Sequence, residues 1–504
     1  MRAPLADAAL AAALGALLGL PLTHTGAWPL SIACVAALVL LCRRTSPRRC
    51  AVIGSVFATA WLASTVWWLY ISMHDYGGLL APLAIAAVLL LCLGLSLFMA
   101  AALWLHARWQ RRAVVRDALL FAGCWLLAEL ARGVVFTGFP WSASGYTQID
   151  GPLAALAPWV GVYGIGAATA WVGAALAGAT LGRRGLVQAA VAVVVLGVLA
   201  VLGPGSFTAD NGRLSVALLQ TNVAQDEKFS ADHLRDELRW VGEQLIASPA
   251  ELTITPETAV PLLPDQLRDL DAQYWPTLAD QFRDGRRAAL VGMPLGDFDH
   301  GYTNSVAGLS RETASLPDGF HRYDKHHLVP FGEFIPFGFR WFVNLMAIPL
   351  GDFARGPLVS PPFVVKAQRV APNICYEDLF GEELAALFAD DASAPTVLAN
   401  VSNIAWFGDT VAIGQHLNIS RMRSLELQRP MLRATNTGAT AIVDHTGHVA
   451  AQLPSFTQGV LRGEVQGRTG LTPFARWASA FGLWPLAALG LVLALQARAG
   501  AKPS

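Results

Sequence analysis

Apolar residues are gathered toward the two ends of the chain, and a more polar block separates them. Long apolar runs lie near residues 5–22, 27–42, 51–71, 79–104, 117–135, 153–180, 184–203 and 474–496. A helix that crosses a bilayer needs roughly 20 such residues. Because more runs follow the first, we interpret it as a membrane helix and not as a signal peptide. The pattern predicts a multi-pass α-helical membrane domain of about eight helices, with seven in residues 1–211 and one, with a tail, in residues 468–504.

The polar block, residues 212–467, shows a different pattern. Short apolar runs typical of strands lie at 214–219, 252–255, 288–292, 304–309, 397–401 and 440–443, and helical patterns lie near 230–247 and 266–283. Strands that alternate with helices indicate an α/β domain. In such sheets the chemistry gathers where strands end.

Charge adds an orientation to this picture. Only 14% of the 504 residues are charged, against about 25% in soluble proteins. Lys and Arg lie in alternate loops and in the C-terminal tail: Arg43, Arg44, Arg48, Arg49, Arg108, Arg111, Arg112, Arg116, Arg183, Arg184, Arg498 and Lys502. The other loops, 71–78 and 136–152, contain none. Under the positive-inside rule the basic loops are cytoplasmic and the polar block is outside. The formal net charge is zero, and nothing in the sequence indicates a nucleic-acid partner.

Glu129 and Arg132 interrupt the fifth apolar run. They are three residues apart, so they share one helix face and can pair. Charged residues at membrane depth often mark functional sites. A structural ion pair is an equally good interpretation.

Cys375 is the one cysteine of the polar block. The other five precede the block, in or beside apolar runs: Cys34, Cys42, Cys50, Cys92 and Cys124. A disulfide within the block is therefore excluded, and Cys375 is a core residue, an adventitious thiol or a nucleophile. It follows an apolar strand pattern at 363–370 and precedes a helical pattern at 379–387. We expect its sulfur at a helix N-terminus, where the helix dipole and free N–H groups favour a thiolate.

Two other reactive groups lie at or near strand ends. Glu257 follows Thr253-Ile254-Thr255-Pro256, and Lys325 follows Tyr323-Asp324. A thiol that attacks an acyl carbon needs a base for its proton and a positive donor for the oxyanion. Glu257, Lys325 and Cys375 supply these parts without a histidine.

Longer motifs surround these three residues. They are Thr255-Pro256-Glu257-Thr258, the stretch 324–336, Asn373-Ile374-Cys375-Tyr376-Glu377, the stretches 402–409, 421–426 and 433–438, and Thr137-Gly138-Phe139-Pro140-Trp141. The order Glu, Lys, Cys resembles the triad of the nitrilase (carbon–nitrogen hydrolase) superfamily. The motifs together resemble its membrane-embedded apolipoprotein N-acyltransferase family over nearly the whole chain. The resemblance implies a nitrilase-like α-β-β-α sandwich on a membrane base, in a Gram-negative inner membrane with the sandwich facing the periplasm.

The resemblance also implies a role for each matching residue. Cys375 would be the nucleophile, Glu257 the general base and Lys325 the oxyanion donor. Supporting or substrate-binding roles fall to Glu333, Tyr376, Glu377, Trp406 and Phe229. At Phe229 the family often has Trp, so the aromatic ring is kept but the indole N–H is lost.

The implied reaction has two steps and needs no cofactor. Cys375 takes an acyl chain from a phospholipid, and the α-amine of the N-terminal diacylglyceryl-cysteine of an apolipoprotein then attacks the thioester. Phospholipid esters are abundant outside the inner membrane, where ATP and acyl-CoA are not. The expected partners are these two substrates and the bilayer, and we expect a monomer.

Two other functions fit parts of the sequence. A membrane-tethered nitrilase-type amidohydrolase would use the same triad, although eight spans exceed what a tether needs. A transporter would need more intramembrane polar residues than Glu129 and Arg132. We expect no metal site, because His321, His326 and His327 fit no standard zinc spacing.

The apolar stretch 339–350 follows Glu333. It is either a core helix or an arm that touches the bilayer and guards the acyl pocket. We favour the arm, because the stretch is apolar nearly all round and is bounded by Gly338 and Gly351.

Overall fold

The computed structural model describes residues 4–111, 113–226, 228, 231–283, 285–343 and 352–496. These residues form two compact units. The first unit comprises Met1–Tyr70, Leu80–Ser206 and Ala480–Ser504. The second comprises Ile71–Leu79 and Phe207–Ser479.

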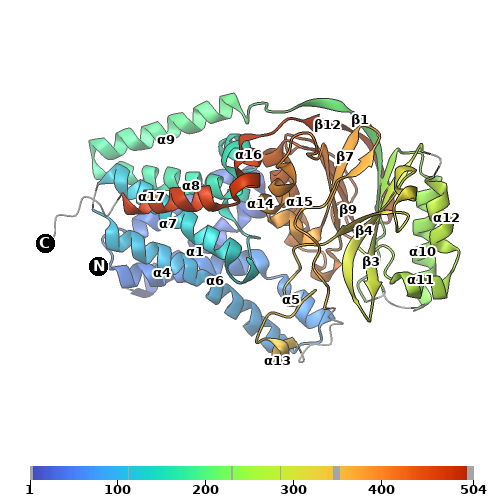
Figure 1. The fold of residues 1–504 in the computed structure, drawn as a ribbon. Helices are drawn as coiled ribbons and strands as arrows, with labels where there is room; N and C mark the ends of the chain where they lie inside the picture. The colour runs from blue at the N-terminus through green and yellow to red at the C-terminus, as the bar shows by residue number, and fades with distance from the viewer. Residues whose placement is uncertain are drawn as a thin grey trace. The chain divides into compact units, whose positions relative to one another are not determined.

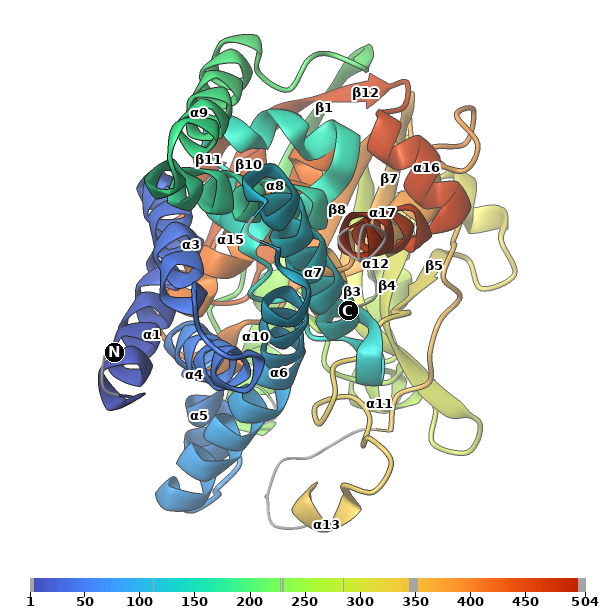
Figure 2. The same ribbon diagram turned by 90° about the vertical axis from the view of Figure 1, so that its left-hand side faces the viewer.

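The first unit is a bundle of helices (Figure 2). Its α-helices are α1 (Pro4–Leu18), α2 (Leu20–Thr23), α3 (Trp28–Cys42), α4 (Pro47–Val66), α6 (Ala81–Trp109), α7 (Val114–Val134), α8 (Ala157–Gly178), α9 (Arg183–Leu202) and α17 (Trp484–Leu495). Within the described ranges, seven helical segments are long and apolar enough to cross a membrane, up to the segment Arg183–Leu202. The seven N-terminal spans expected from the apolar runs are therefore present as helices. Proline in the first turn of α3, α4 and α6 fits the helix start, where no intrahelical N–H bond is lost.

The sequence predicted one continuous helix for the apolar run at 474–496, but the structure shows two. It forms α16 (Pro473–Phe481) and α17, which are separated at Gly482, a residue with φ +54°. The buried residues of α16, Phe474, Ala475 and Ala478, pack into a core of the second unit. The break follows from this packing, because α16 is amphipathic whereas α17 is apolar throughout.

The second unit contains two six-stranded sheets. In the first sheet the order is β12-β1-β2-β3-β4-β5, with bounds Gly459–Thr469, Ala209–Gln220, Leu252–Ile254, Ala288–Asp297, Gly301–Leu309 and His321–Asp324. In the second it is β11-β10-β9-β8-β7-β6, with bounds Val449–Gln452, Ala441–Val443, Met431–Thr435, Val397–Ser402, Gln368–Ile374 and Phe363–Val365. Strands β1, β2 and β3 are parallel, and so are β7, β8 and β9.

The two sheets pack face to face around one apolar core. Leu218, Ile254 and Leu290 of the first sheet share this core with Ile374 and Val401 of the second. A second core lies between the first sheet and helices α10 (Ala231–Ala247), α11 (Pro264–Leu270) and α12 (Tyr274–Gln281). A third lies between the second sheet and helices that include α14 (Gly381–Ala385) and α16. The result is the predicted α-β-β-α sandwich, visible at the right of Figure 1.

One helix of the sandwich differs from the expectation. The pattern predicted a single helix over 266–283, but α11 ends at Leu270 and α12 begins at Tyr274. Asp271 between them is extended, and its carboxylate accepts a hydrogen bond from the Gln273 N–H at 2.9 Å. Aspartate favours such local turns, which compete with a continuous helix.

Candidate active site

The candidate site lies where strands of both sheets end. Glu257 follows β2, Lys325 directly follows β5 and Cys375 directly follows β7. The register of the first sheet pairs Ser305 of β4 with Asp324 of β5, which places Lys325 beside Asn304. The backbone N–H of Lys325 donates to the Asn304 carbonyl at 2.9 Å.

A buried lysine links two carboxylates. The Lys325 ammonium lies 2.8 Å from Glu333 Oε1 and 3.4 Å from Glu257 Oε1. Burial lowers the pKa of Lys325, but the carboxylates of Glu333 and Glu257 raise it by more, so that its pKa ends above the ordinary value. Lys325 therefore stays charged.

Asn304 is a member of this cluster that the sequence did not reveal. Its Nδ2 donates at 2.7 Å to both Glu257 Oε1 and Glu333 Oε1. One neutral amide thus holds two carboxylates beside the same ammonium. The only sequence signal was its position at the start of the apolar run 304–309, which gave no reason to choose it over other polar residues near strands.

Other groups orient Glu257 and the turn that carries it. Glu257 Oε2 accepts from the backbone N–H of Asn403 at 2.8 Å. Lys228, a second buried lysine, donates to the Glu257 carbonyl at 3.2 Å and to the Thr258 hydroxyl. Burial lowers the pKa of Lys228, while Glu237, Glu257 and Cys375 oppose that change. The glutamate is therefore fixed at both its side chain and its backbone.

Cys375 sits in a strained turn. Its φ is +52°, in the left-handed region that non-glycine residues rarely adopt. The Ser402 hydroxyl donates to its sulfur at 3.3 Å. Burial, followed by the charge of Glu257, raises the pKa of the Cys375 thiol to about 12, against the opposing charge of Lys325. At neutral pH the thiol is protonated and needs a base.

The prediction that Cys375 is a thiolate at a helix N-terminus is wrong. The element that begins at Cys375 is η8, a five-residue 3-10 helix (Cys375–Leu379), and Phe380 then interrupts it before α14. So short an element has a weak dipole, and burial dominates the pKa.

Glu377 joins the turn at Cys375 to the loop that carries Lys325. Its Oε2 accepts from the Tyr323 hydroxyl and the Ile374 N–H, both at 2.7 Å. Its Oε1 accepts from the backbone N–H groups of His326 at 2.7 Å and His327 at 3.1 Å. Burial raises the pKa of Glu377, and these donors oppose the rise. The carboxylate therefore fixes the spacing between the two sheets at the site.

Two of the remaining candidates, Tyr376 and Trp406, have aromatic neighbours. Tyr376 is buried and packs its ring against Phe380 and His327. Trp406, in η10 (Ala405–Phe407), meets the ring of Tyr76 edge-on, with ring centroids 5.8 Å apart. Tyr76 ends η2 (Ser72–Tyr76), a π-helical turn of the segment that clusters with the second unit. Phe229 lies outside the described residues.

The described part of the apolar stretch 339–350 is the short helix α13 (Arg340–Val343) and the residue before it. Its aromatic side chains are solvent-accessible, with Phe339 45% and Trp341 64% exposed. Phe337, just before the stretch, is fully exposed. This exposure contradicts a core helix for the described residues. Residues 344–350 lie outside them.

The three candidate metal-binding histidines have separate partners. His326 Nδ1 contacts the Gly356 carbonyl at 2.9 Å, and His327 Nδ1 contacts Glu383 at 2.9 Å. His321 lies on β5, with its ring near Phe363. Among the residues that the structure describes, no group of three or more His, Cys, Asp or Glu side chains could hold a metal ion.

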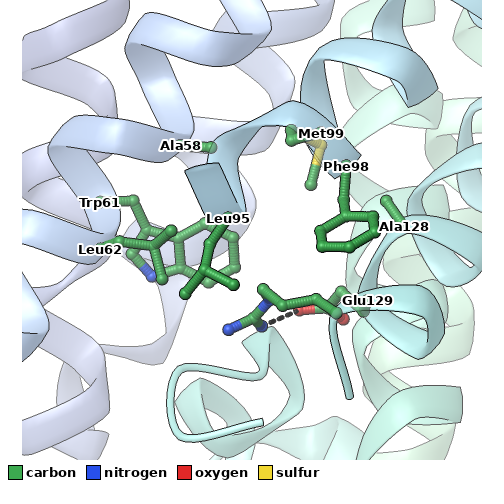
Figure 3. A pocket seen from close by; sticks show the side chains of 9 residues that line it. Ala58, Trp61, Leu62, Leu95, Phe98, Met99, Ala128 and Glu129 are labelled. Carbon is green, nitrogen blue, oxygen red and sulfur yellow. Dashed lines mark ion pairs between the residues drawn. The ribbon is translucent and has the colours of Figure 1, made fainter. Parts of the chain in front are cut away.

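Glu129 and Arg132 of the first unit do pair. Arg132 Nη2 lies 3.6 Å from Glu129 Oε1, beside a small cavity that Trp61, Leu95 and other side chains line (Figure 3). Glu129 also accepts from the N–H and hydroxyl of Ser144, at 2.7 and 2.9 Å. Arg132 donates to the Phe139 carbonyl at 3.1 Å. These bonds tie α7 to the segment 139–144, which supports the structural interpretation of the pair.

Comparison with known proteins gives the family. Residues 14–175 match the model of the apolipoprotein N-acyltransferase N-terminal domain, and residues 215–474 match the carbon-nitrogen hydrolase model. An apolipoprotein N-acyltransferase of Verminephrobacter eiseniae (strain EF01-2) is 51% identical over an alignment of 487 positions that covers 90% of this chain and 89% of that protein. One of Ralstonia nicotianae (strain ATCC BAA-1114 / GMI1000) is 47% identical over an alignment of 512 positions that covers 99% of this chain and 96% of that protein. A crystal structure of a carbon-nitrogen hydrolase from Helicobacter pylori G27 is 15% identical, with a TM-score of 0.36 over 55% of this chain and 94% of that one. The chain belongs to the apolipoprotein N-acyltransferase family.

Proposed function

We propose that this protein transfers an acyl chain from a phospholipid to the α-amine of the N-terminal diacylglyceryl-cysteine of apolipoproteins, with Glu257, Lys325 and Cys375 as its catalytic residues. The family membership supports lipoprotein N-acylation. The observation that carries the residue assignment is the buried Lys325, held by Glu333 and Glu257 beside the protonated thiol of Cys375.

In the first half-reaction Glu257 accepts the thiol proton as the sulfur of Cys375 attacks the ester carbonyl carbon of the phospholipid. Lys325 stabilises the oxyanion of the tetrahedral intermediate. The bond between the carbonyl carbon and the glycerol oxygen then breaks, and Glu257 returns its proton to that oxygen. The products are a lysophospholipid and a thioester on Cys375.

In the second half-reaction the α-amine of the apolipoprotein attacks the thioester carbon. Glu257 accepts a proton from the amine, the carbon–sulfur bond breaks, and the proton passes to the sulfur. An amide is formed and the thiol is regenerated. Because the lysophospholipid leaves before the amine reacts, the kinetics are ping-pong.

The charge of the loops supports a location for the proposed chemistry. We infer a multi-pass protein of a bacterial inner membrane, with its nitrilase-like domain in the periplasm. The distribution of Lys and Arg among the loops supports this orientation. Phospholipid esters are available on that side, and exchange of an ester for an amide through a thioester needs no nucleotide.

The experiment that tests the function uses purified protein in detergent, phospholipid with a labelled acyl chain, and a diacylglyceryl lipopeptide. We expect label in the lipopeptide as an amide, with one lysophospholipid released per amide formed. A lipopeptide with an acetylated α-amine is the matched control and should accept none. Release of free fatty acid at the same rate with and without acceptor, and no amide, would show a hydrolase instead.

A further inference from the structure

Cys375 has a left-handed backbone, and two side-chain donors contact its carbonyl oxygen. A non-glycine residue adopts this region at an energetic cost and persists there only when its surroundings fix it. The carbonyl oxygen of Cys375 lies 3.2 Å from Asn400 Nδ2, on β8, and 3.2 Å from His416 Nε2, on α15 (Val411–Leu427). Both side chains are fully buried.

One arginine, Arg433, fixes the tautomer of His416 and also contacts Asn400. Arg433 Nη2 lies 3.2 Å from His416 Nδ1, and Arg433 Nη1 lies 3.5 Å from Asn400 Oδ1. A guanidinium carries only donors. His416 Nδ1 must therefore be the acceptor, so the ring proton is on Nε2 and is donated to the Cys375 carbonyl. The oxygen of Asn400 likewise turns toward Arg433, and its NH₂ group turns toward the same carbonyl.

The arginine is itself fixed to the nucleophile turn. Arg433 Nη1 lies 3.1 Å from Asp378 Oδ2, three residues after Cys375, and Ser420 contacts both groups. Arg433 and Asp378 are buried. Burial, together with the charge of Arg433, keeps the pKa of His416 well below its ordinary value. His416 is therefore neutral, as the assigned tautomer requires.

We propose that Arg433, acting through His416 and Asn400, is a positioning device that clamps the carbonyl of Cys375 and so holds its sulfur in line with the acyl carbon. The inference rests on the proposed role of Cys375 as nucleophile. Because the peptide that joins Cys375 to Tyr376 is planar, the clamp also fixes the direction of the Tyr376 N–H. None of these three residues touches the reacting atoms.

A matched pair of substitutions at one position tests the clamp. In His416→Gln the amide nitrogen can occupy the place of Nε2, so the donor to Cys375 is kept. In His416→Asn the amide reaches only the place of Nδ1, so that donor is lost. The measurement is alkylation of Cys375 by iodoacetamide in the full-length protein, followed by peptide mass, with rate constant and final extent fitted separately and Cys375→Ala as the blank.

We expect His416→Asn to lower the rate constant about 10-fold, because one of the two donors to the buried carbonyl is lost, at an unchanged final extent. His416→Gln should stay close to wild type. Equal rate constants in the two variants, or a loss of extent without a change in rate constant, would overturn the clamp and leave a purely structural role. If His416→Asn does not fold, Asn400→Asp, which replaces the donor with an acceptor, should slow alkylation in the same way, and a wild-type rate there would overturn the proposal.

This outcome is separate from that of the proposed function. Alkylation needs no lipid, so the comparison at position 416 stands whatever the physiological acyl donor is. Failure of the wild-type protein to form an acyl-enzyme would refute the proposed function without changing the alkylation result.

Discussion

Lys325 lies closer to Glu333 than to Glu257: its ammonium is 2.8 Å from the first carboxylate and 3.4 Å from the second. The other oxygen of Glu333 accepts from the Val329 N–H at 2.8 Å, so that Glu333 is anchored to the loop that carries the lysine. Glu333 thus compensates the lysine charge, which in the proposed mechanism leaves Glu257 to accept the proton of Cys375.

Lys325 is expected to be irreplaceable. Lys325→Ala should lower the rate of acyl-enzyme formation about 10²- to 10³-fold, because one oxyanion donor is lost. Lys325→Arg should not restore it, since a planar guanidinium cannot take the place of a compact ammonium between two carboxylates. Rapid-quench measurement of lysophospholipid release checks both variants, and a wild-type rate for Lys325→Arg would contradict this role.

The role of Glu257 gives a prediction for pH. The pKa of the Cys375 thiol is raised to about 12, from an ordinary value of 9.0, so the thiol is protonated between pH 7 and 9. In Glu257→Gln, alkylation of Cys375 should be slow at pH 7 and should rise about tenfold per pH unit, as the thiolate fraction does. It should level off below pH 12, because the Glu257 carboxylate is one of the groups that raise the thiol pKa. The wild-type rate should rise less steeply, and identical pH profiles for the two proteins would contradict the role of Glu257 as base.

The sequence predicted the layers of the sandwich and the residues that its motifs carry. Local apolar patterns predicted strands near β2, β7 and β8. Residue type then identified the reactive groups at or near strand ends. The sequence could not predict the roles of Asn304 or of the cluster Asn400, His416 and Arg433, because their contacts join residues that are far apart in the chain. Their partners depend on strand register and on the packing of α15, which no local pattern encodes.

Two of the wrong predictions have a common physical cause. The run at 474–496 and the pattern after Cys375 were each interpreted as one helix from their apolar periodicity. In the structure, Gly482 and Phe380 interrupt them, and α14 and α16 pack into a core of the second unit. Periodicity alone does not detect such breaks, because tertiary packing overrides local propensity.

The exposed aromatic residues near α13 are expected to meet lipid. Replacing Phe339 and Trp341 with Ser should weaken capture of the phospholipid, raise hydrolysis of the thioester, or do both, because exposed apolar side chains mark surfaces that bind apolar partners. Leu316→Ser is the control, since Leu316 is 43% exposed in the same unit. Lysophospholipid release and free fatty acid are measured together. Equal values for control and double variant would contradict an arm that binds lipid.

The orientation in the membrane is tested by reporter fusions. Fusions after Ser46 and Arg184 should report the cytoplasm, and a fusion after Asp226 should report the periplasm. The reason is that the positive-inside rule assigns the basic loops to the cytoplasm. A cytoplasmic signal at Asp226 would contradict the proposed location of the nitrilase-like domain.

The covalent intermediate is the central claim, and the intact mass of the protein tests it most directly. After incubation with a phospholipid of defined chain length and no acceptor, the wild-type protein should gain the mass of one acyl chain. Neutral hydroxylamine should remove the added mass, the modified peptide should contain Cys375, and Cys375→Ala should gain nothing. If the acyl chain reaches a lipopeptide while the protein carries no acyl mass at any rapid-quench time, the transfer is a direct displacement. That result would contradict the covalent intermediate.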